Sequence, residues 1–313
     1  MNDLKKAMAF ITTAGLTISA LALAAATSSE APTVGDVAIE QGQVEAGKLP
    51  GKMRIAAVTR DFQAYHLANG HPDFEQYNTG ARLGLVNALL DQDGKPTLAS
   101  SSGMKVSTPY RDADGRPIYP GVYDTARGDV LGVLSPVTDQ AVTNEDSFRQ
   151  WYRDVPGINT SKALEITLER VPGTNRYVFD SDVAEPWASR GGFFPWDKDG
   201  FGDYGSTGHN FHFTTELDTE FVFERDKGHV FTFTGDDDVW VFIDGQLVID
   251  LSGVHGEVEQ TVALDRLAWL EDGHVYTLKV FHAERHTTKS NFRIETTLRL
   301  RSVKLPNTYK PYD

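Results

Sequence analysis

The stretch FTFTGDDDVWVFIDGQLVID, residues 231–250, constrains the fold more than any other part of this 313-residue chain. Residues 239–243 are an unbroken run of apolar, strand-forming residues, and Asp244-Gly245 is a strong two-residue turn signal before a second apolar run. The pattern predicts a β-hairpin whose first strand is buried on both faces. Three consecutive aspartates, residues 236–238, stand at its entrance, where they would repel one another unless water or a cation neutralised them.

From Ile55 onward the rest of the chain also shows a β pattern. Apolar and polar residues alternate over residues 164–169 and again over 276–280, and Gly/Asp turns separate such runs. Period-two alternation of this kind is typical of an antiparallel sandwich. Residues 91–123 contain the turn-forming clusters DQDGKP and RDADGRP and are expected to form long surface loops or an insertion.

One segment predicts a helix. In TNEDSFRQWYRD, residues 143–154, Thr143 and Asp146 have the spacing of a capping box, and Phe148 and Trp151 follow at helical intervals. The aromatic face of this helix is expected to pack in the core.

Composition limits the partners and the chemistry. The formal net charge of −14 argues against nucleic acid as a partner and is compatible with cations. The chain contains no cysteine, which excludes disulfides, thiolate catalysis and cysteine-based zinc sites. Because calcium binds oxygen ligands and is plentiful outside cells, it suits this chain better than a soft metal.

The N-terminal segment predicts export. Lys5 and Lys6 precede an apolar run over residues 7–26 that ends in three alanines, which is typical of a cleavable signal peptide (1–26). The alternative is an uncleaved anchor, since the run is nearly long enough to span a bilayer. A polar linker (27–50) follows, and no second apolar span does. We therefore expect an exported protein without a membrane span in its mature form, either secreted or held at the cell surface or in the periplasm.

Six motifs carry a resemblance to a known family. They are RDFQAYH with HPDFE, FRQWYRDVPGIN, FFPWDKDGFGD, GHNFHFTTEL, the opening hairpin extended through LSGVHG, and HAERHTTKSNFRIETTL. Over roughly residues 54–300 they closely resemble the fibro-slime domain, a branch of the PA14 superfamily of adhesins and lectins. The resemblance implies a mostly β fold: a PA14-like antiparallel β-sandwich over residues 51–303, with long loops, one or two short helices and a C-terminal tail (304–313).

The resemblance also implies a metal site. In calcium-dependent PA14 lectins, two successive aspartates joined by a cis peptide bind one Ca²⁺, which in turn contacts sugar hydroxyls. On this chain those positions are Asp236 and Asp237. The second ligand loop of such lectins follows a late strand, and here Glu284 and Asn291 are the candidate ligands in it. Flocculin-type loops carry an asparagine early in the loop, whereas Asn291 comes late in this one.

Three further residues are expected to contact the ligand, namely Asp238, Arg285 and His286. Two alternatives stay open at this point. Glu284 and Arg285 could instead form ion pairs that fix the loop, and the aspartates could form a solvated acidic loop without a cation.

The function expected from these features is that of an exported, non-catalytic carbohydrate-binding or adhesion module, assisted by calcium and directed at an extracellular glycan. The alternative is a structural or assembly module that binds a surface or matrix protein instead of a glycan. A glycosidase would need two carboxylates about 5–9.5 Å apart across a cleft. The contiguous aspartates do not fit that arrangement, so no enzymatic activity is expected.

Overall fold

The computed structural model describes residues 49–302. The predicted signal peptide (1–26), nearly all of the predicted linker (27–50) and the predicted tail (304–313) lie outside this part. Among the described residues, none of the helices has the length and apolar character needed to cross a membrane.

Most elements are antiparallel strands, joined by long loops. In chain order the strands are β1 (Lys52–Asp61), β2 (Arg82–Leu83), β3 (Met104–Thr108), β4 (Val133–Pro136), β5 (Thr160–Arg170), β6 (Tyr177–Asp180), β7 (Phe213–Val222), β8 (Val230–Gly235), β9 (Asp238–Ile243), β10 (Gln246–Leu251), β11 (Val258–Ala263), β12 (Val275–Glu284), β13 (Phe292–Thr296) and β14 (Arg301–Ser302). The helices are α1 (Glu145–Phe148) and α2 (Trp187–Arg190), with 3₁₀ turns η1 (Pro120–Val122), η2 (Thr125–Arg127) and η3 (Leu264–Arg266).

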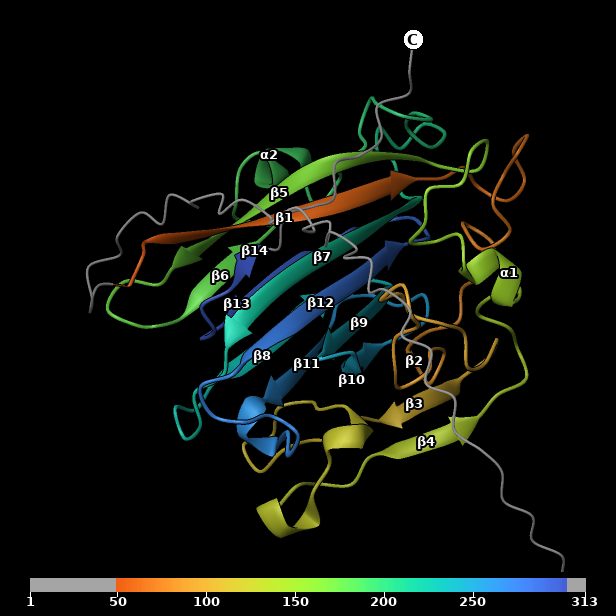
Figure 1. Ribbon diagram of the computed structural model, residues 1–313. Helices are drawn as coiled ribbons and strands as arrows, with labels where there is room; N and C mark the ends of the chain where they lie inside the picture. Colours follow the sequence, from red (N-terminus) through yellow and green to blue (C-terminus); the bar gives the residue numbers. More distant parts are fainter. Residues whose placement is uncertain (1–48, 303–313) are drawn as a thin grey trace, which may run out of the picture. The chain divides into compact units, whose positions relative to one another are not determined.

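The large sheet has eleven strands in the order β10-β9-β12-β7-β1-β5-β6-β13-β8-β11, with β14 pairing on β7. Figure 1 shows β5, β1, β7, β12 and β9 running side by side, with α1 and the small sheet β2-β3-β4 beside them. The path bends between β5 and β6, which share only two register pairs, Glu169 with Val178 and Arg170 with Tyr177. The predicted fold class, a mostly β PA14-like sandwich with two short helices, is confirmed.

The first and last strands of the path lie next to each other. The backbone N–H of Asp250 in β10 donates to Oε1 of Gln260 in β11 at 2.9 Å, and Gln260 Nε2 donates back to the Asp250 carbonyl at 2.8 Å. One side chain thus satisfies both backbone groups of a residue at the sheet edge, where unpaired groups would otherwise attract another strand.

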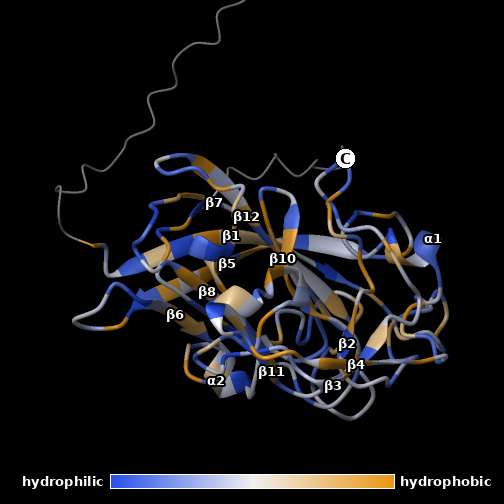
Figure 2. Ribbon diagram, turned by 90° about the horizontal axis from the view of Figure 1, so that it is seen from below, coloured by the Kyte–Doolittle hydropathy of each residue, from blue (hydrophilic) through white to orange (hydrophobic). Residues whose placement is uncertain are grey.

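The hairpin predicted from the sequence is β9 and β10, joined by Asp244 and Gly245 with φ of 52° and 72°. Every residue of β9 is buried, which confirms that both faces are covered. Val239, Val241 and Ile243 face the core enclosed by the large sheet, whereas Trp240 and Phe242 face a second core. Figure 2 shows hydrophobic stretches along the strands of the large sheet.

The second core is built by the loops that follow β1 and by α1. Its members include Phe62, Phe74, Phe148 and Trp151, all buried. The predicted helix in residues 143–154 is present but has only four residues, and its capping box is formed by Asn144 and Ser147, not by Thr143 and Asp146. Asn144 is the N-cap residue because its side-chain oxygen accepts a hydrogen bond from the N–H of Ser147 at 2.9 Å.

Three connections between distant strands meet at one end of the sheet. They are residues 236–237 between β8 and β9, 252–257 between β10 and β11, and 285–291 between β12 and β13. The strand register brings them together, since Ala283 pairs with Asp238 while Phe292 and Val258 both pair with Gly235. The fold therefore places the acidic residues beside the loop predicted to complete their site.

Candidate functional site

The three connections enclose a pocket of about 410 Å³, which we call the acidic pocket. Its lining comes from all three connections together with one residue of the loop after β1: Asn78, Asp236, Asp237, Val254, His255, Gly256, Glu257, His286, Thr287, Thr288, Lys289 and Asn291. Four of the seven residues predicted for the site, Asp236, Asp237, His286 and Asn291, line this pocket. The other three, Asp238, Glu284 and Arg285, do not.

Asp236 and Asn291 face each other across the pocket. The Asn291 amide Nδ2 donates to both carboxylate oxygens of Asp236, at 3.2 and 3.1 Å. Asp236 is almost fully buried, and burial raises its pKa from 3.8 to about 6. An asparagine amide carries both a donor and an acceptor, so rotation of Asn291 would turn its oxygen toward a cation held by Asp236.

Asp237 turns the chain from β8 into β9. Its φ of 50° lies in the left-handed region, which aspartate and asparagine adopt more readily than most residues. The predicted cis peptide between Asp236 and Asp237 is wrong: the cis bonds of the described residues are Glu185–Pro186 and Thr287–Thr288. The left-handed turn, instead of a cis bond, takes the two aspartates out of the alternation of a regular strand.

The Asp237 carboxylate accepts three backbone hydrogen bonds. Oδ1 accepts from the N–H of His255 at 3.2 Å, and Oδ2 accepts from those of Arg285 and His286 at 2.8 and 3.0 Å. Burial nevertheless raises the pKa of Asp237 to about 7. Desolvation is the largest effect here, and it exceeds the opposing influence of the Arg285 charge and of the backbone donors.

Neither Asp236 nor Asp237 forms an ion pair within 4 Å with a described residue, although the charges of Lys289 and Arg285 act on Asp236 and Asp237 respectively. Glu257, which also lines the pocket, raises the pKa of Asp236 further. Within residues 49–302, no three His, Cys, Asp or Glu side chains converge as a metal-binding group. A cation in this pocket would therefore need the amide of Asn291 and backbone carbonyls in addition to Asp236 and Asp237. Calcium accepts such mixed oxygen ligands, whereas zinc prefers nitrogen and sulfur.

Asp238 and Arg285 form a buried ion pair behind the pocket. Arg285 Nε lies 2.6 Å from Asp238 Oδ2, and neither side chain is exposed. The N–H of Gly253 donates to the other oxygen of Asp238 at 2.7 Å. Because both are fully buried and engaged, the expectation that they contact a ligand does not fit their positions. The alternative of ion pairing in this loop is realised by Arg285 with Asp238, not with Glu284.

Glu284 ends β12 with its side chain fully buried, and neither carboxyl oxygen has a hydrogen-bond partner among the described residues. Burial, reinforced by the charge of Asp237, raises the pKa of Glu284 well above its ordinary value. Burial of this kind favours the protonated form of the carboxyl group. Glu284 lies beneath the acidic pocket instead of lining it, which does not favour the predicted role as a direct metal ligand.

Sequence reasoning missed Glu75, which holds the loop after β12. Glu75 accepts from the N–H and the hydroxyl of Thr287 at 3.2 and 3.1 Å, and it lies 3.0 Å from His212 Nε2 and 3.7 Å from His286 Nε2. Its own N–H donates to the Arg285 carbonyl at 2.6 Å. The sequence motif HPDFE contains it, but nothing in that motif indicates a partner more than 200 residues away.

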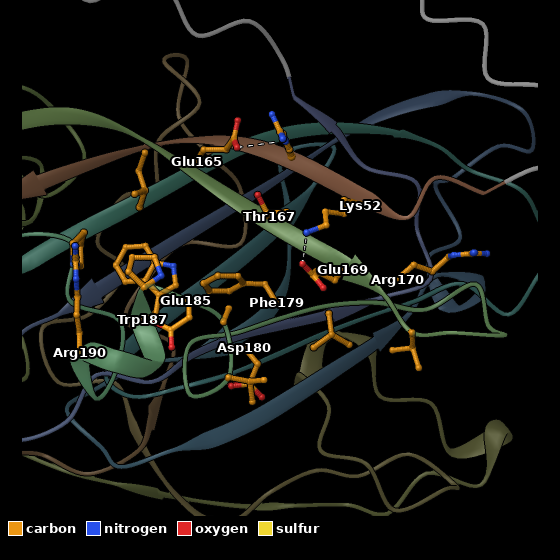
Figure 3. A pocket seen from close by; sticks show the side chains of 18 of the residues that line it. Lys52, Glu165, Thr167, Glu169, Arg170, Phe179, Asp180, Glu185, Trp187 and Arg190 are labelled. Atoms are coloured by element: carbon orange, nitrogen blue, oxygen red, sulfur yellow. Dashed lines mark hydrogen bonds and ion pairs between the residues drawn. The ribbon is translucent and has the colours of Figure 1, made fainter.

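A larger pocket, which we call the β5–β6 pocket, measures about 970 Å³ and lies over β5, β6 and α2. Figure 3 shows Lys52 reaching Glu169 along one wall, with Phe179 and Trp187 on another. Two of its charged pairs join β1 to β5, namely Lys52 with Glu169 at 2.6 Å and Arg54 with Glu165 at 3.6 Å. The pocket contains none of the residues predicted for the site.

Comparison with known proteins supports the resemblance seen in the motifs. Residues 188–308 match the model of the PA14 domain. The chain is 34% identical over 230 residues to Protein psiQ of Dictyostelium discoideum, covering 69% of this chain and 21% of psiQ. It is 38% identical over 202 residues to Protein psiD of the same organism, covering 61% of this chain and 35% of psiD.

The chain thus spans between a fifth and about a third of these two relatives. Among solved structures, a β-glucosidase from Kluyveromyces marxianus in complex with glucose matches 30% of this chain and 11% of its own, at 15% identity and a TM-score of 0.21, which is too low to support an argument. The chain contains a PA14 domain, and the predicted resemblance to the fibro-slime family is confirmed.

Proposed function

We propose that this chain is an extracellular, non-catalytic carbohydrate-binding module whose acidic pocket holds Ca²⁺ through Asp236, Asp237 and Asn291. The PA14 domain supports a module of the binding or adhesion type.

The observation that carries it is the pair of buried carboxylates in the acidic pocket. Burial raises the pKa of Asp236 to about 6 and that of Asp237 to about 7, so keeping both ionised costs free energy in the absence of a cation. Perturbed carboxylates of this kind concentrate at functional sites. A divalent cation would offset the cost directly.

The donor set suits calcium. Asp236 and Asp237 provide carboxylate oxygens, and Asn291 provides an amide oxygen once its side chain rotates. Bound Ca²⁺ would supply an electropositive centre for the hydroxyl oxygens of a sugar. The backbone donors around Asp237 hold its carboxylate in one orientation, which lowers the ordering that binding requires.

Calorimetric unfolding with calcium, magnesium and sodium at matched ionic strength tests the cation. Calcium at 100 times its dissociation constant should stabilise the folded chain by about 2.7 kcal/mol, because only the folded chain assembles the site. Asp237→Asn should abolish this response while preserving the left-handed backbone, since asparagine tolerates it. Asp244→Asn, at the exposed turn of the same hairpin, is the matched control and should respond like the wild type.

Equal stabilisation by all three salts would instead indicate screening of a solvated acidic loop and would end the calcium proposal. A glycan array probed with and without a chelator then tests the ligand. Glycan binding that the chelator and Asp237→Asn both abolish supports the lectin function. Calcium-dependent stabilisation without binding to any glycan would favour the alternative of an assembly module that binds protein.

A further inference from the structure

A second pocket, which we call the aromatic pocket, adjoins the acidic pocket. It measures about 520 Å³ and lies between the loop after β1, the glycine-rich loop 201–207 and the loop after β12. Its lining mixes aromatic rings with groups that form hydrogen bonds: Gln63, His66, Phe201, Tyr204, Ser206 and Thr207. Small-molecule sites combine apolar walls with a few polar groups in this way.

The mouth of the aromatic pocket leaves apolar side chains in water. Leu67 and Phe201 line it and are each 44% exposed, and Tyr65 beside them is 47% exposed. Single exposed apolar residues need no explanation, but several at one concave site indicate a surface that a ligand covers.

The glycine-rich loop is held in place from below. Asp61, at the end of β1, is fully buried and accepts from the N–H of Phe201 at 2.5 Å and from Asn210 Nδ2 at 2.8 Å. A side chain at Gly200 would meet the Asp61 carboxylate at 2.1 Å, so only glycine fits this approach. Tyr204 packs edge-on against His212 at 4.7 Å between ring centroids. The aromatic rings are therefore presented by an anchored loop.

The two pockets share a wall. Thr287 and Thr288 line both of them. Glu75 supports this wall through its two hydrogen bonds to Thr287, and its carboxylate also contacts His212 of the aromatic pocket and His286 of the acidic pocket. A ligand anchored in the acidic pocket and longer than one ring would pass over Thr287 and Thr288 and reach the aromatic pocket.

We propose that the aromatic pocket is a second sugar subsite, so that the ligand of this chain is an oligosaccharide straddling the Thr287–Thr288 wall. This inference rests on the proposed function of the acidic pocket. One face of a pyranose ring presents C–H groups, which pack against the electron-rich face of an aromatic ring, and its hydroxyls pair with amide and hydroxyl groups. Phe201 and Tyr204 supply the first kind of contact, and Gln63, Ser206 and Thr207 supply the second.

Titration calorimetry in calcium tests the second subsite. The probes are D-mannose, D-glucose, D-galactose and N-acetylglucosamine, each with its linear di-, tri- and tetrasaccharide. For the sugar that binds, the oligosaccharide should bind at least tenfold more tightly than the monosaccharide. Phe201→Ala should weaken the oligosaccharide about three- to tenfold and leave the monosaccharide unchanged, because only the longer ligand reaches the aromatic ring.

Two variants make the result specific. Phe201→Trp keeps an aromatic surface and should retain the preference for the oligosaccharide. Leu131→Ala removes a 62% exposed apolar side chain that lines neither pocket and should change nothing. Since Phe201 is exposed, its replacement should leave the fold intact, which thermal unfolding checks.

The outcomes separate this inference from the proposed function. Equal affinity for monosaccharide and oligosaccharide, with no effect of Phe201→Ala, overturns the second subsite and leaves the acidic pocket as a single-sugar site. Absence of binding to every sugar overturns the proposed function and the inference together. Loss of binding to a protein partner in Phe201→Ala, with glycan binding intact, assigns the aromatic pocket to protein recognition and also overturns the inference.

Discussion

The acidic pocket and the β5–β6 pocket differ in how their charged side chains are buried and paired. In the β5–β6 pocket, which is more than twice as large, Lys52 and Glu169 pair while keeping 60% and 65% of their side chains exposed. In the acidic pocket, Asp236 and Asp237 are only 4% and 3% exposed and have no ion-pair partner within 4 Å among the described residues. The smaller pocket holds the charges that are costly to bury.

The difference shows that volume is a poor guide to function in this fold. Exposed pairs across β1 and β5 are solvated and contribute little either way. Buried carboxylates that form no direct ion pair cost free energy to ionise, and binding a cation is one way to offset that cost. Four predictions test this contrast between buried and exposed charge, beginning with the largest expected effect.

The buried pair behind the acidic pocket should be the most sensitive charge in the chain. Arg285→Met leaves Asp238 buried without its partner and removes the hydrogen bonds of Arg285 to the carbonyls of Asp73 and Ala141. We expect the free energy of unfolding to fall by about 3–5 kcal/mol, measured by urea denaturation. The double variant Asp238→Asn with Arg285→Met should lose less than the sum of the two single variants. A loss of less than about 1 kcal/mol in the unfolding free energy of Arg285→Met would contradict the expectation that buried charges are the costly ones.

Asp61 should make the stability depend on pH. Burial raises its pKa from 3.8 to about 7, so between these values the folded chain holds a proton that the unfolded chain has released. The free energy of unfolding should therefore fall as the pH rises from about 4 to 7, by up to about 4 kcal/mol from this group. Asp250, whose pKa burial raises to about 6, should add to the same slope.

Urea denaturation from pH 5 to pH 8 in calcium-free buffer measures this slope. Asp61→Asn should make the slope shallower by the share of this one group, because Asp250, Asp236 and Asp237 still contribute to it. Glu169→Gln, a change in an exposed carboxylate, should leave it unaltered. A slope that persists unchanged in Asp61→Asn would mean that Asp61 is ionised in the folded chain throughout this range.

The hairpin and its two buried faces could be predicted because their signals are local: an unbroken apolar run and a two-residue Asp-Gly turn. The closeness of Asp236 and Asp237 to Asn291 followed only from the family resemblance. The acidic pocket itself depends on β8 pairing with β13 and β9 pairing with β12, whose paired residues lie 35 to 65 positions apart in the sequence. Composition and periodicity carry no information about such pairing.

The different roles of neighbouring acidic residues could not be predicted from the sequence either. Asp237, Asp238 and Glu284 look alike as acidic positions, yet the first lines the pocket and the second pairs with Arg285. The third is buried with no hydrogen-bond partner for its carboxyl oxygens among residues 49–302. Alternation along a strand predicts which face of the sheet a side chain occupies, but not which groups it contacts there. The opposing groups come from loops far along the chain.

Glu284 tests whether a buried acid beneath the pocket acts as a ligand. Burial raises the pKa of Glu284 well above its ordinary value and so favours its neutral form, and Glu284→Gln replaces it with a neutral side chain of similar shape. We expect the free energy of unfolding to change by about 1 kcal/mol or less and the calcium response to persist. Loss of the calcium response in Glu284→Gln, measured by the same calorimetry, would make Glu284 a direct ligand after all.

Breaking the exposed pair Lys52–Glu169 should have the smallest effect of the four, and it tests most directly whether burial makes the loss of a charge partner costly. Lys52→Met removes one partner of a 2.6 Å ion pair, the same change that is expected to be severe at Arg285. Here water solvates the Glu169 carboxylate that is left behind, so the free energy of unfolding should fall by about 0–1 kcal/mol, and less in high salt. Denaturation of both variants in the same buffer compares their losses in the free energy of unfolding directly. If Lys52→Met cost as much as Arg285→Met, burial would not be what distinguishes the two pockets, and the buried carboxylates of the acidic pocket would not require a cation.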